Sequence, residues 1–357
     1  MNTYTAAITA YDAASNPYGI YTVAHLNDVR NNKAGSYKMM NNITLPARNA
    51  AGALAAGISD YADKGWLPIA HDASPDTNVA INAFTGKFDG GNFSVDNFYI
   101  NRNAAGDYYA GLFGRTSGAV ISNTGITGSA SPAVTGSRFV GALAGYIQGG
   151  SVTNCYAHVT VRCESNNAYI TAFAGGLLGA LRGASLSASY SSGNVSGNHL
   201  PANATLYIGG LAGALLEGTA NIRNCFSTGN INIEASGAIY GGGLAGALLV
   251  SIANCYATGN VTFTAQSAQS INLGALGGLI GNVAAYTNCY RNSNAAITSG
   301  GQPATLRDAS VSTPKTKAEM QTDAFKGNLN GTSGTAWGRD GGKNDGLPYI
   351  IGVGVGR

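Results

Sequence analysis

The sequence predicts an all-β solenoid, a parallel β-helix of about six repeats with a small α/β cap at each end. Three observations predict it. A Gly-Gly-Leu-x-Gly motif recurs at nearly constant spacing, an Asn-Cys-Tyr motif follows several copies, and only 10% of the residues are charged. A fixed period of roughly 20–50 residues is typical of solenoids, in which each coil contacts only its neighbours.

The leucine of the glycine-rich motif marks each repeat. Its successive separations are 31, 34, 34, 33 and 35 residues. We expect these leucines to form one buried column, with coils about 4.8 Å apart. The predicted column contains Leu112, Leu143, Leu177, Leu211, Leu244 and Leu279.

Three short strands are expected in each repeat. The first carries the glycine motif, the second carries the aliphatic residue before the Asn, and the third runs from Cys-Tyr to Gly-Asn. Surplus residues, such as 197–204 and 262–272, are expected to form loops. Asn tolerates left-handed backbone and can bond to its equivalent in the next coil, which predicts two Asn columns at the corners. One column would hold Asn123, Asn154, Asn224, Asn254 and Asn288, and the other Asn194, Asn230 and Asn260.

The segments on both sides of the repeats are predicted to be caps. Residues 1–109 are expected to form an N-terminal cap with the first irregular coils, 110–295 the repeats, and 296–357 a C-terminal cap with one short helix. Such lids close the open ends of a solenoid core.

Helix signals occur in both caps. Thr22 is placed to cap a helix that extends to Asn32. Thr316 and Glu319 have the spacing of a capping box, which predicts a helix through Leu329. The apolar face of that second helix would consist of Met320, Ala324, Phe325 and Leu329.

Composition excludes several classes of protein. The net charge of +3, without a run of Lys or Arg, excludes a nucleic-acid footprint. No segment approaches the roughly 18 consecutive apolar residues of a membrane span, so membrane insertion is not expected. The 45% hydrophobic content excludes a disordered chain.

The cysteines are predicted to be free buried thiols. Four of the five follow an Asn at the same repeat position, as small apolar residues of a core would. No pair has the spacing of a zinc site. The five are Cys155, Cys163, Cys225, Cys255 and Cys289.

The repeat Gly-Gly-Leu-x-Gly followed by Asn-Cys-Tyr-Ala-Thr-Gly-Asn-Val resembles the GLUG motif of bacterial surface proteins. The segments 66–69, 88–92 and 110–114 resemble the lead-in to GLUG repeats, and 317–320 and 337–349 resemble the segment that closes them. The resemblance implies a right-handed parallel β-helix, and a place among adhesins and accessory regions of immunoglobulin-cleaving proteases. It brings no catalytic residues.

The same resemblance implies an extracellular or cell-surface location. The first residues lack a basic segment and an apolar core, so no signal peptide is visible. We therefore expect a mature fragment from which the signal peptide has been removed.

Enzyme activity is not expected from the residues. β-Helix enzymes that act on polysaccharides need paired carboxylates, whereas the acidic residues of the repeats are expected at different repeat positions and so should not converge. No histidine lies at a sequence spacing from a Ser or Cys that would indicate a nucleophile motif. The acidic residues are Glu164, Glu217 and Glu234, and the histidines are His25, His71, His158 and His199.

Two glycine-rich turns are candidates for a calcium ion, one at Asp89 and one at Asp340. Calcium favours such oxygen-rich turns, although neither matches a complete calcium loop. Ordinary turns without a cofactor are therefore the expected role.

An aromatic stripe is the candidate binding face. Side chains alternate faces along a strand, so an inward Cys places the next aromatic outward. The stripe would contain Tyr156, Tyr190, Phe226, Tyr256 and Tyr290. It would either bind a sugar or an apolar partner surface, or stabilise the sheet by stacking or lie under loops; an inward orientation is the remaining alternative.

These observations favour a non-catalytic adhesion or binding module, whose partner is a protein or glycan on a host or neighbouring cell. A structural stalk or assembly unit is the alternative. A polysaccharide-active enzyme is the third hypothesis, and a pair of carboxylates on one face would favour it.

Overall fold

The computed structural model describes most of the chain, and the account below concerns that part alone. The described residues are 18–47, 58, 60–74, 82–164, 171–198, 201–216, 222–264, 268–281 and 285–357.

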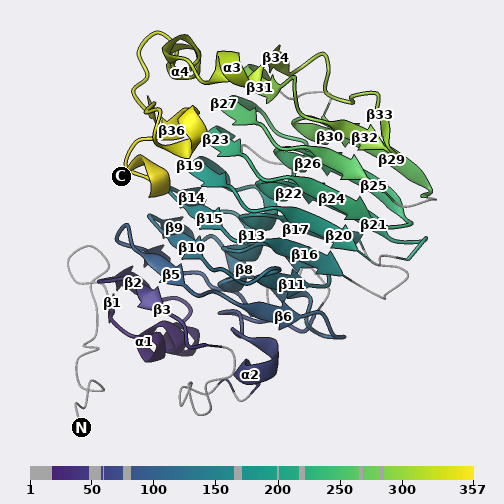
Figure 1. The fold of residues 1–357 in the computed structure, drawn as a ribbon. Helices are drawn as coiled ribbons and strands as arrows, with labels where there is room; N and C mark the ends of the chain where they lie inside the picture. Colours follow the sequence, from purple (N-terminus) through teal and green to yellow (C-terminus); the bar gives the residue numbers. More distant parts are fainter. Residues whose placement is uncertain are drawn as a thin grey trace.

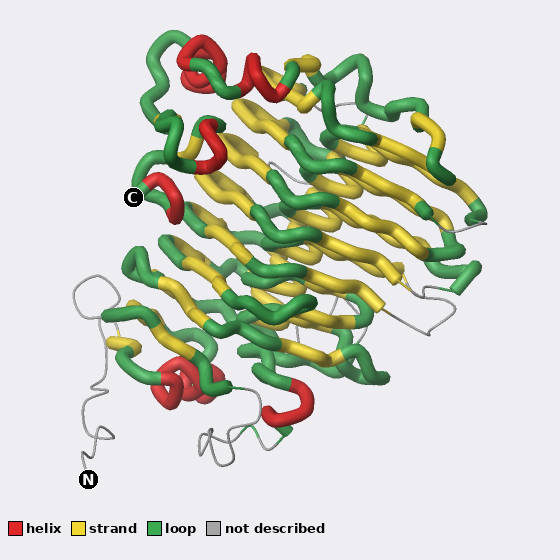
Figure 2. Tube along the Cα trace, in the orientation of Figure 1, coloured by secondary structure: helices red, strands yellow, loops and turns green. Residues whose placement is uncertain are grey.

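These residues form a mostly-strand β-solenoid of about six turns, with few helices (Figure 1). Adjacent coils pair in parallel. Among the described strand pairs, the antiparallel ones are β32 (Ile297–Ser299) with β33 (Gln302–Pro303) and β35 (Trp337–Gly338) with β36 (Tyr349–Ile350). The α-helices lie near the two ends of the stack, and short helical turns of the C-terminal segment lie along its side (Figure 2). No described helix is long and apolar enough to cross a membrane.

Each complete coil contributes strands to four sheets. In the order in which the chain passes through them, we call these sheets D, C, A and B. Sheet D contains β7 (Tyr109–Ala110), β12 (Phe139–Val140), β17 (Thr171–Gly175), β21 (Thr205–Gly209), β25 (Ala238–Gly242) and β29 (Ser270–Gly274). Sheet C contains β8 (Phe113–Ser117), β13 (Ala144–Gln148), β18 (Leu178–Arg182), β22 (Ala212–Leu216), β26 (Ala245–Leu248) and β30 (Gly277–Ile280).

Sheet A is the widest, with 14 strands. It contains β1 (Tyr18–Ile20), β2 (Ser36–Met39), β3 (Ile43–Thr44), β4 (Lys87–Asp89), β5 (Ser94–Asp96), β9 (Val120–Ser122), β10 (Gly125–Thr127), β14 (Ser151–Thr153), β15 (Tyr156–His158), β19 (Ser185–Ser191), β23 (Ile222–Ser227), β27 (Ile252–Ala257), β31 (Tyr286–Asn292) and β34 (Thr313–Lys315).

Sheet B completes each coil. It contains β6 (Ile100–Arg102), β11 (Val134–Gly136), β16 (Val161–Glu164), β20 (Val195–Asn198), β24 (Ile231–Glu234), β28 (Val261–Phe263), β32 (Ile297–Ser299) and β33 (Gln302–Pro303).

The expected three-strand repeat is therefore wrong in detail. The glycine motif forms the corner between sheets D and C, so a strand precedes it that we had not expected. The strand β29 lies partly in 262–272, which we expected to be a loop. Conversely, the second and third expected strands both belong to sheet A, where β23 and β27 run straight through the Asn.

The leucine column is confirmed for its first five members, which are fully buried. The sixth is wrong. Leu244 donates its backbone N–H to Leu276, whereas Leu279 pairs with Ala247 in the neighbouring strand. Leu279 is only half-buried and lies outside the coil, with a second cluster of side chains. The Gly-Gly-Leu sequence at 277–279 matches the motif, but it lies three residues after the structural equivalent of the motif in earlier coils. Leu276 is therefore the residue that continues the core column.

Both Asn columns are confirmed. The first has left-handed backbone, with φ between 51° and 56° at its five positions. Asn154 donates its side-chain amide to Asn123 at 3.0 Å, and Asn288 donates to Asn254 at 3.0 Å. Ala188, at φ 48°, replaces Asn in the third copy and interrupts the ladder. In the second column the backbone N–H of Asn260 donates to the Asn230 side chain at 2.9 Å.

Regular coils begin before residue 110. The strands β4, β5 and β6 pair in parallel with β9, β10 and β11 of the following coil. α1 (Val23–Asp28) begins with the expected Thr22 cap, and η2 (Val29–Asn31) and α2 (Tyr61–Lys64) complete the N-terminal helices.

The C-terminal region differs from the expected single helix. The capping box at Thr316 is present, but α3 (Lys317–Met320) ends there and Thr322 caps a separate α4 (Asp323–Asn330). Met320, Phe325 and Leu329 are buried as expected, whereas Ala324 is exposed. The rest comprises β35 (Trp337–Gly338), η3 (Asn344–Gly346), β36 (Tyr349–Ile350) and η4 (Gly354–Gly356).

Asp308 closes the corner of the last coil between sheets D and C. Its carboxylate accepts the backbone N–H groups of Ala275, Leu276 and Gly277. No following coil offers carbonyl groups to these three amides, so the Asp308 carboxylate accepts their hydrogen bonds instead. Burial raises the pKa of Asp308, and the three backbone hydrogen bonds oppose that rise.

Candidate functional site

The predicted aromatic stripe points out of the coil, as expected, but it is covered. Cys155, Cys225 and Cys255 belong to the inner core, while the aromatic residues that follow them form a separate cluster outside sheet A. Tyr190 is 0% exposed and Tyr156 is 9% exposed. The stripe therefore offers no open binding face in this structure.

The C-terminal segment provides the cover. We define residues 337–357 as the C-terminal strap, and it runs beside β27, β23 and β19 instead of closing the end of the stack (Figure 1). Tyr256 donates its hydroxyl to the carbonyl of Pro348 at 2.6 Å, and Val355 donates its N–H to the Tyr190 hydroxyl at 3.0 Å. The expected lid is thus a lateral strap, because a row of outward aromatic rings needs apolar cover.

His158 links two side chains below the end of the strap. Its Nε2 lies 2.8 Å from the Tyr190 hydroxyl, and its Nδ1 lies 3.0 Å from the Ser192 hydroxyl. Burial lowers the pKa of His158. Sequence spacing did not predict this Ser–His contact, because the two residues come from adjacent coils.

A second aromatic ladder, missed by the sequence analysis, lies outside sheet D. Neighbouring ring centroids are 4.8–5.2 Å apart with interplanar angles of 6–10°. The rings stack face to face, so their faces are already occupied by other rings and are not free for a sugar. The ladder therefore stabilises coil stacking. Its members are Tyr109, Phe139, Phe173, Tyr207 and Tyr240.

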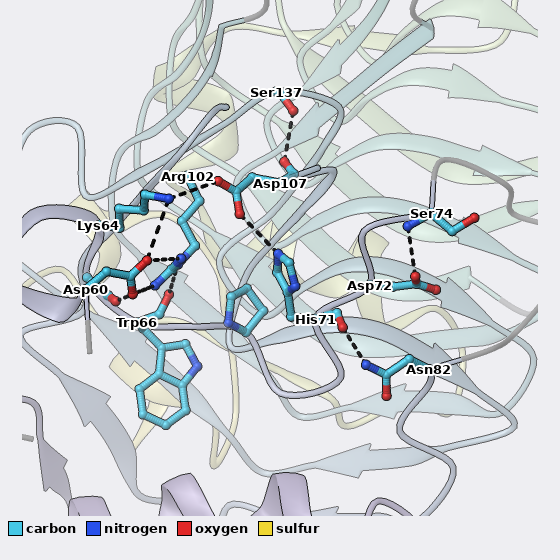
Figure 3. A network of polar contacts seen from close by, with 12 residues as sticks. Asp60, Lys64, Trp66, His71, Asp72, Ser74, Asn82, Arg102, Asp107 and Ser137 are labelled. Atoms are coloured by element: carbon cyan, nitrogen blue, oxygen red, sulfur yellow. Dashed lines mark hydrogen bonds and ion pairs between the residues drawn. The ribbon is translucent and has the colours of Figure 1, made fainter. Parts of the chain in front are cut away.

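A charged network joins the N-terminal cap to the first coils (Figure 3). Arg102 is 3% exposed and donates to both carboxylate oxygens of Asp60, at 3.0 and 2.6 Å. Asp107 contacts His71 at 3.1 Å and Lys64 at 3.8 Å. The Arg102 hydrogen bond is the largest cause that lowers the pKa of Asp60.

Within the described residues, the His71–Asp107 contact of this network has no Ser, Thr or Cys side chain bonded to the histidine. The Ser137 hydroxyl donates to the backbone carbonyl of Asp107 and not to His71. A hydrolytic triad requires a nucleophile bonded to the imidazole. The network therefore serves to fix α2 and its flanking chain against β6.

The outer face of sheet B carries a polar ladder. Val161, Val195 and Ile231 point into the core, so the alternate residues of the same strands point to solvent. The register places polar side chains in two columns across four coils. One column is Arg162, Ser196, Asn232 and Thr262, and the other is Glu164, Asn198, Glu234 and Thr264.

Two carboxylates share this face, contrary to expectation. Glu164 and Glu234 both pair with Asn198, one on each side of it. Their Cα atoms are therefore two strand spacings, about 10 Å, apart. Each glutamate lies three residues after the first core residue of its strand, which is Val161 or Ile231. This equal spacing is the sequence signal that would have placed both glutamates in one column. Glu217 and His199 lie outside the described residues.

A pocket of about 270 Å³ opens on the polar ladder. Arg162, Asn198 and Glu234 line it, with Pro132 at one side. Two buried polar atoms of these side chains, Arg162 Nε and Asn198 Oδ1, have no hydrogen-bond partner within the described residues. The pocket is the place on this face where a ligand could complete the hydrogen bonding.

The two calcium candidates close ordinary turns. Asp89 accepts the N–H of Gly91 and the side-chain amide of Asn123, both at 2.9 Å, and Asp340 accepts the N–H of Gly342 at 2.9 Å. Within the described residues, no group of three His, Cys, Asp or Glu side chains could hold a metal ion.

The five cysteines are free and buried, as predicted. Burial raises the pKa of Cys155 and of Cys163 to about 12. Thiols with such a pKa remain protonated at neutral pH and act as core residues.

Fold and surface together define a β-solenoid with one polar ladder and one covered aromatic stripe. The model of the GLUG motif matches residues 136–162 and 204–232, so the chain contains GLUG motif repeats. Each match spans the strands of one coil in sheets D, C and A and ends within a strand of sheet B. No curated protein matches the chain.

A solved structure from Bacteroides ovatus, described as a "putative immunoglobulin A1 protease", has the same fold. The two share 19% sequence identity with a TM-score of 0.65, over 95% of this chain and 94% of that one. At this level of identity the likeness concerns the fold alone.

Proposed function

We infer that this chain is a non-catalytic binding module of a secreted or cell-surface bacterial protein, with the outer face of sheet B as its binding face. One observation carries the proposal. Eight polar side chains stand in register over four coils, and a pocket with two unpartnered polar atoms opens among them. The GLUG repeats support the surface location by family resemblance.

The face suits an extended partner on a host or neighbouring cell. Its columns present amide, hydroxyl, carboxylate and guanidinium groups at the regular spacing of the coils, which can bond repeatedly to a polar ligand. The covered stripe at Tyr190 and Tyr256 is not part of this proposal, because the strap buries both residues.

A polysaccharide-active enzyme is the second candidate, because Glu164 and Glu234 lie on one face. Inverting glycosidases hold their carboxyl groups roughly 6.5–9.5 Å apart. However, a general acid is usually sheltered so that it stays protonated, and Glu234 is exposed. The binding module is therefore the better-supported function.

Protease activity has less support. The nearest Ser–His contact in the described residues joins Ser192 and His158, but the other ring nitrogen of His158 contacts Tyr190 and no carboxylate. A triad would need an acidic group at that nitrogen. Incubation with immunoglobulin A1 should therefore leave the antibody intact.

The test combines a glycan array with a pull-down against host extracellular proteins. Binding by the wild type that is lost in Arg162→Ala, with Arg223→Ala as the control, supports the proposal. Arg223 is an exposed arginine on sheet A, far around the coil from the pocket. A chain that binds nothing in either assay would favour the structural stalk, and release of reducing sugar would favour the enzyme.

A further inference from the structure

The pocket on sheet B has the features of a small-ligand site. Its volume of about 270 Å³ lies just below the roughly 300–1,000 Å³ that ligand sites span. Its floor is rigid, because the core residues Val161 and Ile231 fix the strands that carry it. Such a site fits one small polar unit better than a folded protein domain.

The hydrogen-bonding needs of the pocket are mixed. Arg162 Nε is a buried donor and Asn198 Oδ1 is a buried acceptor, and neither has a partner in the described residues. Both atoms belong to side chains that are only half-buried and that line the pocket. A ligand that completes the site must therefore both donate and accept.

Charge narrows the class of ligand. Arg162 contributes a positive charge, and Glu234 in the same pocket contributes a negative one. Glu164 stands two residues from Arg162 on the same face of β16. An anionic ligand would face the Glu234 carboxylate in the pocket, with Glu164 nearby on β16, and a cationic ligand would face the guanidinium, so a neutral ligand is favoured.

We propose that this pocket binds one unit of a neutral saccharide. Hydroxyl groups both donate and accept, so a single sugar can accept from the Arg162 guanidinium and donate to the Asn198 and Glu234 side chains. Ser196 and Asn232 lie in the adjacent column and offer further bonds along the stack. This inference rests on the proposed binding function of sheet B and names its ligand class.

The experiment uses the full chain and immobilised oligosaccharides. The neutral probes are hexamers of β-1,4-linked glucose, β-1,4-linked mannose and β-1,3-linked galactose, and the acidic probe is a hexamer of α-1,4-linked galacturonate. We expect the wild type to retain at least one neutral probe. Arg162→Ala and Asn198→Ala should each weaken that binding at least tenfold, while Arg223→Ala leaves it unchanged.

Thermal melting is the control that shows whether the variants still fold. Both pocket variants change outward side chains, so their melting temperatures should stay within a few degrees of the wild type. Asn198→Ser is the second variant, because a hydroxyl retains an acceptor at the pocket and should restore part of the binding.

Three results would overturn the saccharide inference. They are retention of the acidic probe alone, binding that survives both pocket variants, and failure to bind any probe. If a protein partner is then captured and lost in Arg162→Ala, the proposed binding function stands without the saccharide. If neither probe nor protein binds, both proposals fail.

Discussion

Single asparagines connect one coil to the next at the corner inside sheet A. Asn254 accepts a side-chain hydrogen bond from Asn288 and donates one to Asn224, with donor–acceptor distances of 3.0 and 3.3 Å. Its φ of 55° is costly for most residues other than Gly, Asn and Asp. The residue therefore contributes through its side chain and through its tolerance of the turn.

Two substitutions at Asn254 separate these contributions. Asn254→Gly should lose the two amide bonds alone and cost about 1–2 kcal/mol of unfolding free energy. Asn254→Ala should cost about 1 kcal/mol more, because it adds the strain of left-handed backbone. Denaturant unfolding measures both, and equal losses for the two variants would contradict the role of the turn.

The buried leucines offer a second residue-scale test. Leu211 is fully buried in the core column, so Leu211→Ala should cost about 2–5 kcal/mol. Leu279→Ala is the matched control, since Leu279 lies half-buried outside the coil and should cost clearly less. A loss at Leu279 as large as at Leu211 would contradict the register described here.

The pattern of the sequence predicted the leucine column because every copy buries the same side chain. It failed at the last copy, where glycines on both sides of Leu276 allow two alignments. It also missed the shared column of Glu164 and Glu234, because no motif residue marks that position. Counting strand residues from the core valine would have revealed it.

At the scale of elements, the C-terminal strap is the least predictable part. The local signals that precede it, such as the Thr316 capping box, are correct. Its docking site is not encoded locally, since Val355 contacts Tyr190 from 165 residues away. The sequence predicted the outward row of aromatics, and only the structure identifies what covers them.

Removal of the strap tests its role as a cover. A chain that ends at residue 336 should keep its β-sheet signal in circular dichroism but expose Tyr190, Phe226 and Tyr256. We expect a melting temperature lower by several degrees and increased binding of a hydrophobic dye, because apolar surface is uncovered. Trp337→Ala, which removes one large ring from the same cluster, should have a smaller effect in the same direction. Unchanged melting and dye binding would show that the strap does not stabilise the solenoid.

The strap should also respond to pH through His158. Burial lowers the folded-state pKa of His158 below its unfolded value of about 6.5. The unfolded chain then binds the proton first, so stability is fully present above about pH 6.5 and falls as the pH drops below it. The groups around the ring are Tyr156, Tyr190 and Ser192, with Arg357 over the Tyr156 ring.

Melting temperatures of wild type and His158→Gln between pH 8 and pH 5 would measure this effect. The wild type should lose more stability than the variant across the window below about pH 6.5, because Gln cannot take up the proton. Parallel profiles for the two proteins would remove His158 as the cause.

For the whole molecule, the stack is a one-dimensional object whose ends must be closed. At its C-terminal end, Asp308 bonds the backbone amides of the last corner, and β34 extends sheet A beyond β31. At its N-terminal end, α1 and α2 lie beside the first coils (Figure 2). The parallel pairing of the sheet B strands holds the polar ladder in register, and the closed ends keep this stack from pairing with other chains.

Deletion of residues 1–100 tests the N-terminal closure. The deletion removes β4 and β5, and so leaves the backbone groups of β9 and β10 without their partners. It also uncovers Phe113 and Ile121, which are buried in the intact core. An open edge beside an exposed core pairs readily with other chains, so we expect concentration-dependent aggregation in light scattering and size-exclusion chromatography.

A shorter deletion of residues 1–17 removes no described strand and serves as the control, for which we expect a monomer with the melting temperature of the full chain. A soluble monomeric product from the longer deletion, with unchanged melting, would mean that the coils after residue 100 close their own end and that the N-terminal region is not a cap.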